Sequence, residues 1–176
     1  MAGYHETIWP AQIIAIIMAL FVLIALFRSF RYSDRLTGLV LALFWLWTGA
    51  FFYIREFSLL SFLAPVQGGF FVIQAALLFW FGGIRNKLSF QYRHNLKEWL
   101  GLVFFATALI IYPSIIAFYE GQWESFRLVG VTPFATTLFT LGSLFTMRTS
   151  KVLKSALMFI PILHLIASLA TAWTLV

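Results

Sequence analysis

One ionisable side chain, His164, stands in the middle of a long apolar run between Val152 and Val176. Burial of an imidazole in apolar surroundings costs free energy unless a partner or a cavity compensates, so His164 is a candidate binding or pathway residue. The alternative is structural, with a neutral imidazole hydrogen-bonded to a threonine, a glutamine or a carbonyl group that a nearby proline has freed. The residues alone favour neither interpretation.

Four neutral polar residues share a depth in their apolar stretches. Gln12, Gln67, Thr132 and Thr136 each lie in the half of a stretch that is farther from the connections rich in Lys and Arg. Thr132, Thr136 and Thr140 also recur every four residues, which places them on one face of a helix. Such a stripe either lines a hydrated path or hydrogen-bonds across to another helix, and packing is the commoner use. The shared depth of the four residues predicts a polar pocket that opens outward.

Arg55 and Glu56 are adjacent at the end of another apolar stretch. Charged side chains in this position reach lipid headgroups at little cost, so interfacial anchoring is their simplest role. The alternative is that either residue binds a substrate carboxylate or moves a proton.

The chain has no cysteine, which excludes disulfides, thiolate metal sites and a cysteine nucleophile. It also lacks the HExxH, GxSxG, P-loop and GxGxxG motifs of metal, acyl-transfer and nucleotide chemistry. The histidines His5, His94 and His164 are too dispersed for an evident metal cluster or for a haem held by two of them. We therefore expect no metal and no cofactor and assign no catalytic residue, although a single axial ligand to a pigment stays open.

The elements that must position these residues are six apolar stretches, near Trp9 to Phe27, Leu36 to Ile54, Phe57 to Gly83, Trp99 to Tyr119, Val129 to Met147 and Val152 to Val176. Each is close to the roughly 20 residues that a helix needs to cross a bilayer. With 62% hydrophobic and 10% charged residues, 176 residues could not be wrapped in polar surface by a soluble fold. The sequence predicts an all-α transmembrane bundle of six spans, in a single domain over residues 1–176.

Basic residues fall in every second connection. The connections 28–35, 85–98 and 148–154 hold ten of the twelve Lys and Arg residues: Arg28, Arg31, Arg35, Arg85, Lys87, Arg93, Lys97, Arg148, Lys151 and Lys154. Because basic residues beside a span resist translocation, these connections should be cytoplasmic and both termini outside. The lipid bilayer is thus the expected partner. Nucleic acid is not expected, because the basic residues flank spans instead of forming a patch on a soluble domain.

Four prolines, Pro65, Pro113, Pro133 and Pro161, lie within the predicted spans and should mark helix breaks that face protein or a cavity. The third span is the most irregular, because Gln67, Gly68 and Gly69 closely follow Pro65. A kink with close packing through the two glycines is the simpler interpretation, and a break that lines a ligand site is the alternative.

Several short motifs occur in order along residues 6 to 145: Trp9-Pro10-Ala11-Gln12, Trp45-Leu46-Trp47-Thr48-Gly49 with Tyr53, Phe71-Val72-Ile73-Gln74, Trp99-Leu100-Gly101 with Tyr112-Pro113, and Thr136-Thr137 with Phe139-Thr140-Leu141-Gly142. In these the chain resembles an uncharacterised family of small bacterial integral membrane proteins. The resemblance implies six spans in the bacterial cytoplasmic (inner) membrane and brings no established activity. The family's cysteine and second proline are replaced here by Phe134 and Ala135, so no metal role of that cysteine carries over.

Three functions are compatible with the sequence. The first is a small-solute or ion transporter or a channel-like protein, which would need to oligomerise to form a path. The second is an accessory subunit of a larger membrane complex, favoured by the many aromatic residues. The third is a membrane enzyme acting on lipid, with His164 or Glu56 as the base.

Overall fold

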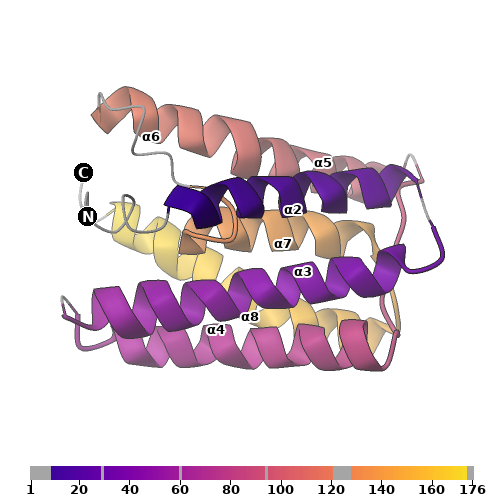
Figure 1. Ribbon diagram of the computed structural model, residues 1–176, viewed down its shortest axis with the longest axis horizontal. Helices are drawn as coiled ribbons and strands as arrows, with labels where there is room; N and C mark the ends of the chain where they lie inside the picture. Colours follow the sequence, from indigo (N-terminus) through magenta and orange to yellow (C-terminus); the bar gives the residue numbers. More distant parts are fainter. Residues whose placement is uncertain (1–8, 29, 60, 94, 121–127, 174–176) are drawn as a thin grey trace.

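The computed structural model describes residues 9–28, 30–59, 61–93, 95–120 and 128–173. Regular structure in this part is helical apart from one two-stranded ladder (Figure 1). The elements are α2 Trp9–Phe27; α3 Ser33–Trp47 with η1 Thr48–Glu56 and η2 Phe57–Leu59; α4 Ala64–Leu78 with η3 Phe79–Ile84; β1 Ser89–Phe90; α5 Leu96–Ala106 with η4 Thr107–Ile111 and α6 Tyr112–Glu120; α7 Pro133–Thr146; β2 Met147–Arg148; and α8 Lys151–Trp173. The expected all-helical class is confirmed.

Four helices in the described part are long and apolar enough to cross a membrane: Ser33–Leu59, Ala64–Ile84, Leu96–Tyr119 and Lys151–Ala170. A fifth apolar helix, Gln12–Phe27, is shorter. The remaining element, α7, has 14 residues, which at 1.5 Å per residue is about 21 Å against a hydrocarbon core of about 30 Å. The predicted fifth span is therefore a short helix that follows a non-helical turn and leads into strand β2.

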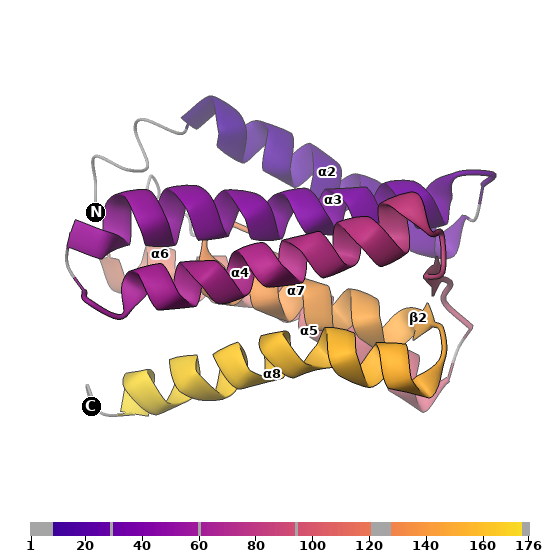
Figure 2. The same ribbon diagram turned by 90° about the horizontal axis from the view of Figure 1, so that it is seen from below.

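The helical segments alternate in direction. The start of α2 and the end of α8 lie at one end of the bundle, and the connections that contain residues 28–35, 85–98 and 148–154 lie at the other (Figures 1 and 2). The three basic connections that the sequence groups on one side are thus together in space.

Two of the four prolines begin helices instead of breaking them. The helix of the second segment runs on to Leu59, and α4 begins at Ala64, so Pro65 lies in its first turn. Pro133 is likewise in the first turn of α7. The first turn has no intrahelical acceptor for an N–H, so proline costs nothing there. The predicted third span therefore started too early, because residues 57–59 continue the helix of the second segment and the interruption next to Pro65 is the connection between two helices. Pro161, by contrast, does lie inside α8.

Helix α7 is the centre of the bundle. It contacts α3, η1, α5, η4 and α8, and eleven of its fourteen residues are buried (Figure 2). The turn that leads into it, residues 128–132, is not helical, and Val129 to Thr132 are buried. Irregular backbone is tolerated at membrane depth only where protein covers it. The surrounding helices provide that cover.

Three glycine pairs bring helix backbones together. A Cβ added to Gly142 of α7 would lie 2.9 Å from the carbonyl oxygen of Gly101 in α5, and the reverse distance is also 2.9 Å. A Cβ added to Gly38 would lie 2.8 Å from the Cα of Gly82, and a Cβ added to Gly49 would lie 3.1 Å from the carbonyl oxygen of Gly68. Small residues allow this close approach, which lets the two backbones pack directly against each other. Of the two glycines after Pro65, Gly68 packs closely, whereas Gly69 has nothing within 4 Å of such a Cβ.

Gly142→Ala is expected to destabilise the bundle, because the new methyl group meets backbone that has no rotamer by which to move away. The expected cost is about 1–3 kcal/mol. Gly69→Ala is the matched control, since it brings the same helix-propensity gain into open space. Thermal unfolding of both variants in detergent measures the difference. Equal midpoints would show that the Gly101 and Gly142 contact does not hold α5 against α7.

Candidate functional site

His164 lies near the middle of α8 and is half-buried. Its Nε2 is 2.8 Å from the hydroxyl oxygen of Tyr53, and its Nδ1 is 2.9 Å from Oγ1 of Thr137. Ser168, one turn further along α8, has its Oγ 3.5 Å from Nε2. Both ring nitrogens therefore have a hydroxyl partner inside the bundle.

Four segments of the chain meet at this imidazole. Tyr53 comes from η1, Thr137 from α7 and Phe71 from α4, and the Phe71 ring stands nearly perpendicular to the imidazole at 4.9 Å between centroids. Tyr53, Phe71 and Thr137 are all buried. η1 is a π-helix, a form that is rare and frequent at functional sites. The site is thus assembled from residues up to 111 positions apart.

Hydroxyl partners give the site a particular chemical property. A neutral imidazole needs a donor at one nitrogen and an acceptor at the other, and a hydroxyl group can serve as either. A protonated imidazole donates from both nitrogens, and the oxygens of Tyr53 and Thr137 can accept both hydrogens. The imidazole can therefore gain or lose a proton without losing a hydrogen bond at either nitrogen.

The threonine stripe is used in contacts between segments. Thr140 Oγ1 accepts a hydrogen bond from the Trp45 indole N–H at 2.7 Å. Thr136 Oγ1 accepts from the Gly130 N–H at 2.9 Å and lies 3.4 Å from the Thr48 hydroxyl. The spacing of these threonines allows either a hydrated path or hydrogen bonds between helices, and the observed bonds are of the second type.

Thr132 stands at the start of the same helix and is buried. Its hydroxyl donates to the Leu128 carbonyl at 3.1 Å, within the turn that leads into α7. Gly130 in that turn has φ +80, and a Cβ there would lie 2.5 Å from the Phe44 ring. Position 130 therefore requires glycine for two reasons, the positive φ of the turn and the closeness of the turn to α3.

Gln74 has a role that the sequence reasoning missed. Pro161 has no N–H to donate to the carbonyl of Leu157, four residues earlier in α8. The Gln74 side chain supplies the missing donor, with Nε2 2.9 Å from the Leu157 oxygen. Its own Oε1 is buried without a partner. The sequence did contain a signal for this bond. Gln74 is an amide inside one apolar stretch, and Pro161 is a proline at a similar depth in another.

The remaining predicted site residues lie apart from His164. Gln12 is buried on α2 and Gln67 is half-buried on α4, and neither is among the hydrogen-bond partners of His164. Arg55 and Glu56 are exposed at the end of η1, with the Arg55 Nε 3.6 Å from the Glu56 Oε1. Such an exposed neighbouring pair fits interfacial anchoring.

Among the residues that the structure describes, no three His, Asp or Glu side chains come together as a metal-binding group. His5 and His94 lie outside the described residues. The contacts of the described site allow hydrogen bonding and proton exchange at the imidazole of His164.

A family model for a family of unknown function, DUF6064, matches residues 1–175. The chain belongs to the DUF6064 family. No curated protein and no solved structure matches it. The resemblance to an uncharacterised family is confirmed, and the match extends over nearly the whole chain.

In this DUF6064 chain, Gln74→Leu is expected to destabilise the fold by about 1–3 kcal/mol, because the Leu157 carbonyl is left buried without a donor. Pro161→Ala restores an N–H at the position that normally bonds this carbonyl. Gln74→Leu should therefore cost much less in a Pro161→Ala background, a coupling that a double-mutant cycle of unfolding free energies measures.

Gln67→Leu is the matched control, because Gln67 is a half-buried amide on the same helix that does not bond Leu157. It should show no coupling to Pro161→Ala. A cost of Gln74→Leu that is identical in both backgrounds would contradict the assigned role of Gln74.

Proposed function

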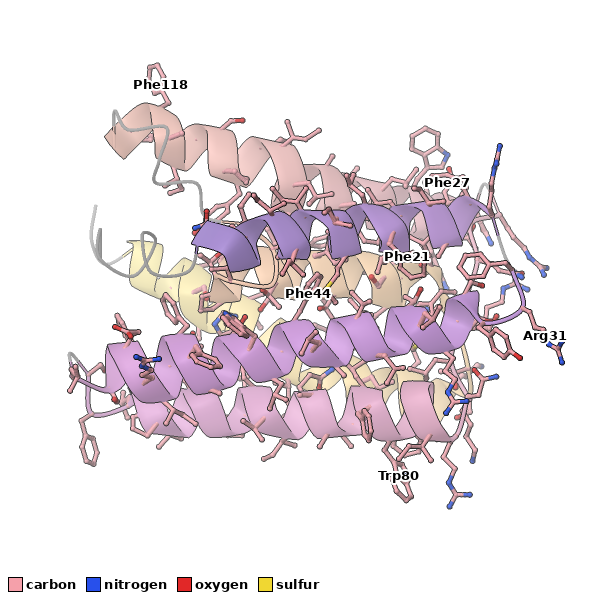
Figure 3. The ribbon with its side chains drawn as sticks, in the orientation of Figure 1. Phe21, Phe27, Arg31, Phe44, Trp80 and Phe118 are labelled. Carbon is pink, nitrogen blue, oxygen red and sulfur yellow. The ribbon has the colours of Figure 1, made fainter. Side chains whose placement is uncertain are left out.

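We propose that this DUF6064 chain is an integral protein of the bacterial cytoplasmic membrane with six helical segments. The basic connections 28–35, 85–98 and 148–154 face the cytoplasm, and both termini face outward. The proposal is supported by the apolar helices and by the grouping of nitrogen-bearing side chains at one end of the bundle (Figure 3). Five segments contact lipid, and the short helix α7 is enclosed by them.

Within the membrane, the proposed activity is transport of a small solute or ion, with protons as the transported or coupling species. The single observation that carries this is the imidazole of His164 held between two hydroxyl groups where four segments meet. An ionisable side chain at depth that can change protonation state without losing partners is suited to a proton relay. Pro161, three residues away, removes one backbone hydrogen bond of α8 beside the site, and Gln74 from α4 bonds the Leu157 carbonyl instead.

A second candidate, an accessory subunit of a larger membrane complex, is favoured by one observation. The hydroxyl groups of Thr136 and Thr140 accept hydrogen bonds from Gly130 and Trp45 inside the bundle, so this stripe has a structural role. Such a subunit would keep a partner after mild solubilisation. Among the residues that the structure describes, Glu56 is paired with Arg55 and not with His164, so their contacts do not favour the lipid-enzyme alternative.

Transport can be tested with purified protein in liposomes that contain a pH-sensitive dye. Wild type should carry protons faster than protein-free liposomes under an imposed pH difference, and His164→Gln should return the rate to the protein-free level. Tyr53→Phe should lower the rate, because it removes one hydroxyl partner of the ring.

Thr107→Val is the control for the flux experiment, since Thr107 is half-buried and its hydroxyl donates to the Val103 carbonyl of its own helix, away from His164. Unfolding midpoints establish that each variant is folded. Equal flux in wild type and His164→Gln would reject His164 as the site. Wild-type flux equal to that of empty liposomes, together with a stably bound partner chain, would favour the accessory subunit.

Topology can be tested directly because the chain has no cysteine to remove. A membrane-impermeant maleimide should label Leu59→Cys in intact cells, and should label Lys87→Cys and Ser150→Cys only after permeabilisation. Ile73→Cys, exposed on the side of α4, should resist labelling in both cases. The reverse pattern would invert the proposed orientation, and labelling of Lys87→Cys and Ser150→Cys from opposite sides would reject the six-segment arrangement.

A further inference from the structure

The three basic connections are joined into one surface, here called the basic platform and defined as the described residues of 28–35, 85–98 and 148–154. Strands β1 and β2 pair antiparallel, which joins the second connection to the third. The Phe90 N–H donates to Oδ1 of Asp34 at 2.7 Å, and the Tyr92 N–H donates to the Leu26 carbonyl at 3.1 Å. The second connection is thus fastened to the other two.

Hydrophobic anchors hold the platform against the bundle. Leu88 and Phe90, on either side of Ser89, are both 1% exposed. The Tyr92 ring packs on that of Phe27 with centroids 5.2 Å apart. The cations of the second connection are therefore presented on an ordered segment.

The acids of the platform are engaged by backbone groups. Besides the Asp34 bond, Oε2 of the buried Glu98 accepts a hydrogen bond from the Arg93 N–H. The ion pair found in the described part of the chain joins Arg55 to Glu56, at the opposite end of the bundle. Ten cations thus face two carboxylates that make no ion pair with them.

Most of the cations point away from the protein. Nine are exposed, and Arg31 extends beyond the end of the bundle in Figure 3. The tenth, Lys154, is half-buried and donates from Nζ to the carbonyls of Phe145 and Met147 at 3.4 and 3.0 Å. The charge of the platform is therefore available to an external anion.

Exposed aromatic rings border the platform. Trp80 and Tyr32 are 46% and 55% exposed, and each has an arginine over its ring, Arg85 at 5.4 Å and Arg31 at 5.5 Å. Aromatic rings with cations beside them are typical of the depth at which lipid headgroups lie. This arrangement distinguishes the platform from a soluble phosphate site, which has no need of such a border.

We infer that the basic platform binds the phosphate groups of anionic phospholipids in the leaflet it faces. The inference rests on the membrane placement proposed above, and it assigns a partner to a surface that the transport site does not use. Several exposed Lys and Arg side chains with no acidic partner complement the negative charge of such a leaflet. The interaction should weaken with salt, because the charges are exposed.

The test counts the lipids that the full-length protein retains. Protein in a neutral detergent is mixed with phosphatidylglycerol and phosphatidylcholine at equal mole fraction, and the bound lipids are counted by native mass spectrometry. Wild type should retain phosphatidylglycerol in excess. Arg85→Gln, Lys87→Gln and Arg148→Gln combined should bring the ratio close to that of the mixture, and Lys87→Gln alone should lower it partly.

Arg55→Gln is the matched control, because it removes one arginine whose charge is already paired with Glu56. It should leave the ratio unchanged. Equal retention of both lipids by wild type, or an equal loss in Arg55→Gln, would overturn the inference. Displacement of phosphatidylglycerol by inorganic phosphate would also overturn it and assign the platform to free phosphate.

The single variant Lys87→Gln keeps the test decisive if the triple variant does not fold, which its unfolding midpoint reveals. Failure of lipid selectivity leaves proton flux and cysteine labelling untouched. Conversely, loss of flux in His164→Gln should not change the lipid ratio. The failure of this inference can therefore be told apart from the failure of the proposed function.

Discussion

Polar groups inside an apolar bundle must find their partners within the protein, and this requirement determines which helices of the structure are neighbours. The clearest case is the carbonyl of Leu157, which Pro161 deprives of its donor and Gln74 satisfies from another helix. The bond from the Trp45 indole to Thr140 meets the same need between α3 and α7. Each of these bonds also ties two segments together. The hydrogen bonds that satisfy the buried polar groups therefore also fix which helices are neighbours.

Such short bonds require close helices, and the glycine pairs make the closeness possible. Contact of Gly101 with Gly142 brings α5 against α7 with no side chain between the backbones. On another side of the bundle, Gly130 allows the turn before α7 to pass against the Phe44 ring. A helix of 14 residues can thus be enclosed together with the non-helical turn before it, although it is too short to cross a bilayer core of about 30 Å alone. The enclosed helix then presents Thr137 to His164 from the inside.

The helical class and the common side of the basic connections could be predicted because hydropathy and charge are local properties of the sequence. The start of α4 could not, because a proline in an apolar run looks the same in a first turn as in a helix interior. Pro65 is of the first kind and Pro161 of the second, and only the paths of the neighbouring helices separate them. A threonine was among the expected partners of His164, but Tyr53 lies 111 residues away and its closeness depends on the packing of both η1 and α8 against α4 and α7. The outward-facing pocket stays a prediction, as does a homo-oligomer.

A partner that can only donate, or only accept, a hydrogen bond would hold the imidazole of His164 in one fixed tautomer. Main-chain carbonyl groups, for example, accept but cannot donate. His164 has a hydroxyl group at each nitrogen instead, from Tyr53 and Thr137, and neither hydroxyl imposes a direction on the bond. The same contacts therefore hold the helices in every protonation state of the ring. Structural and functional interpretations of His164 are therefore compatible, and what separates them is whether protons reach the ring.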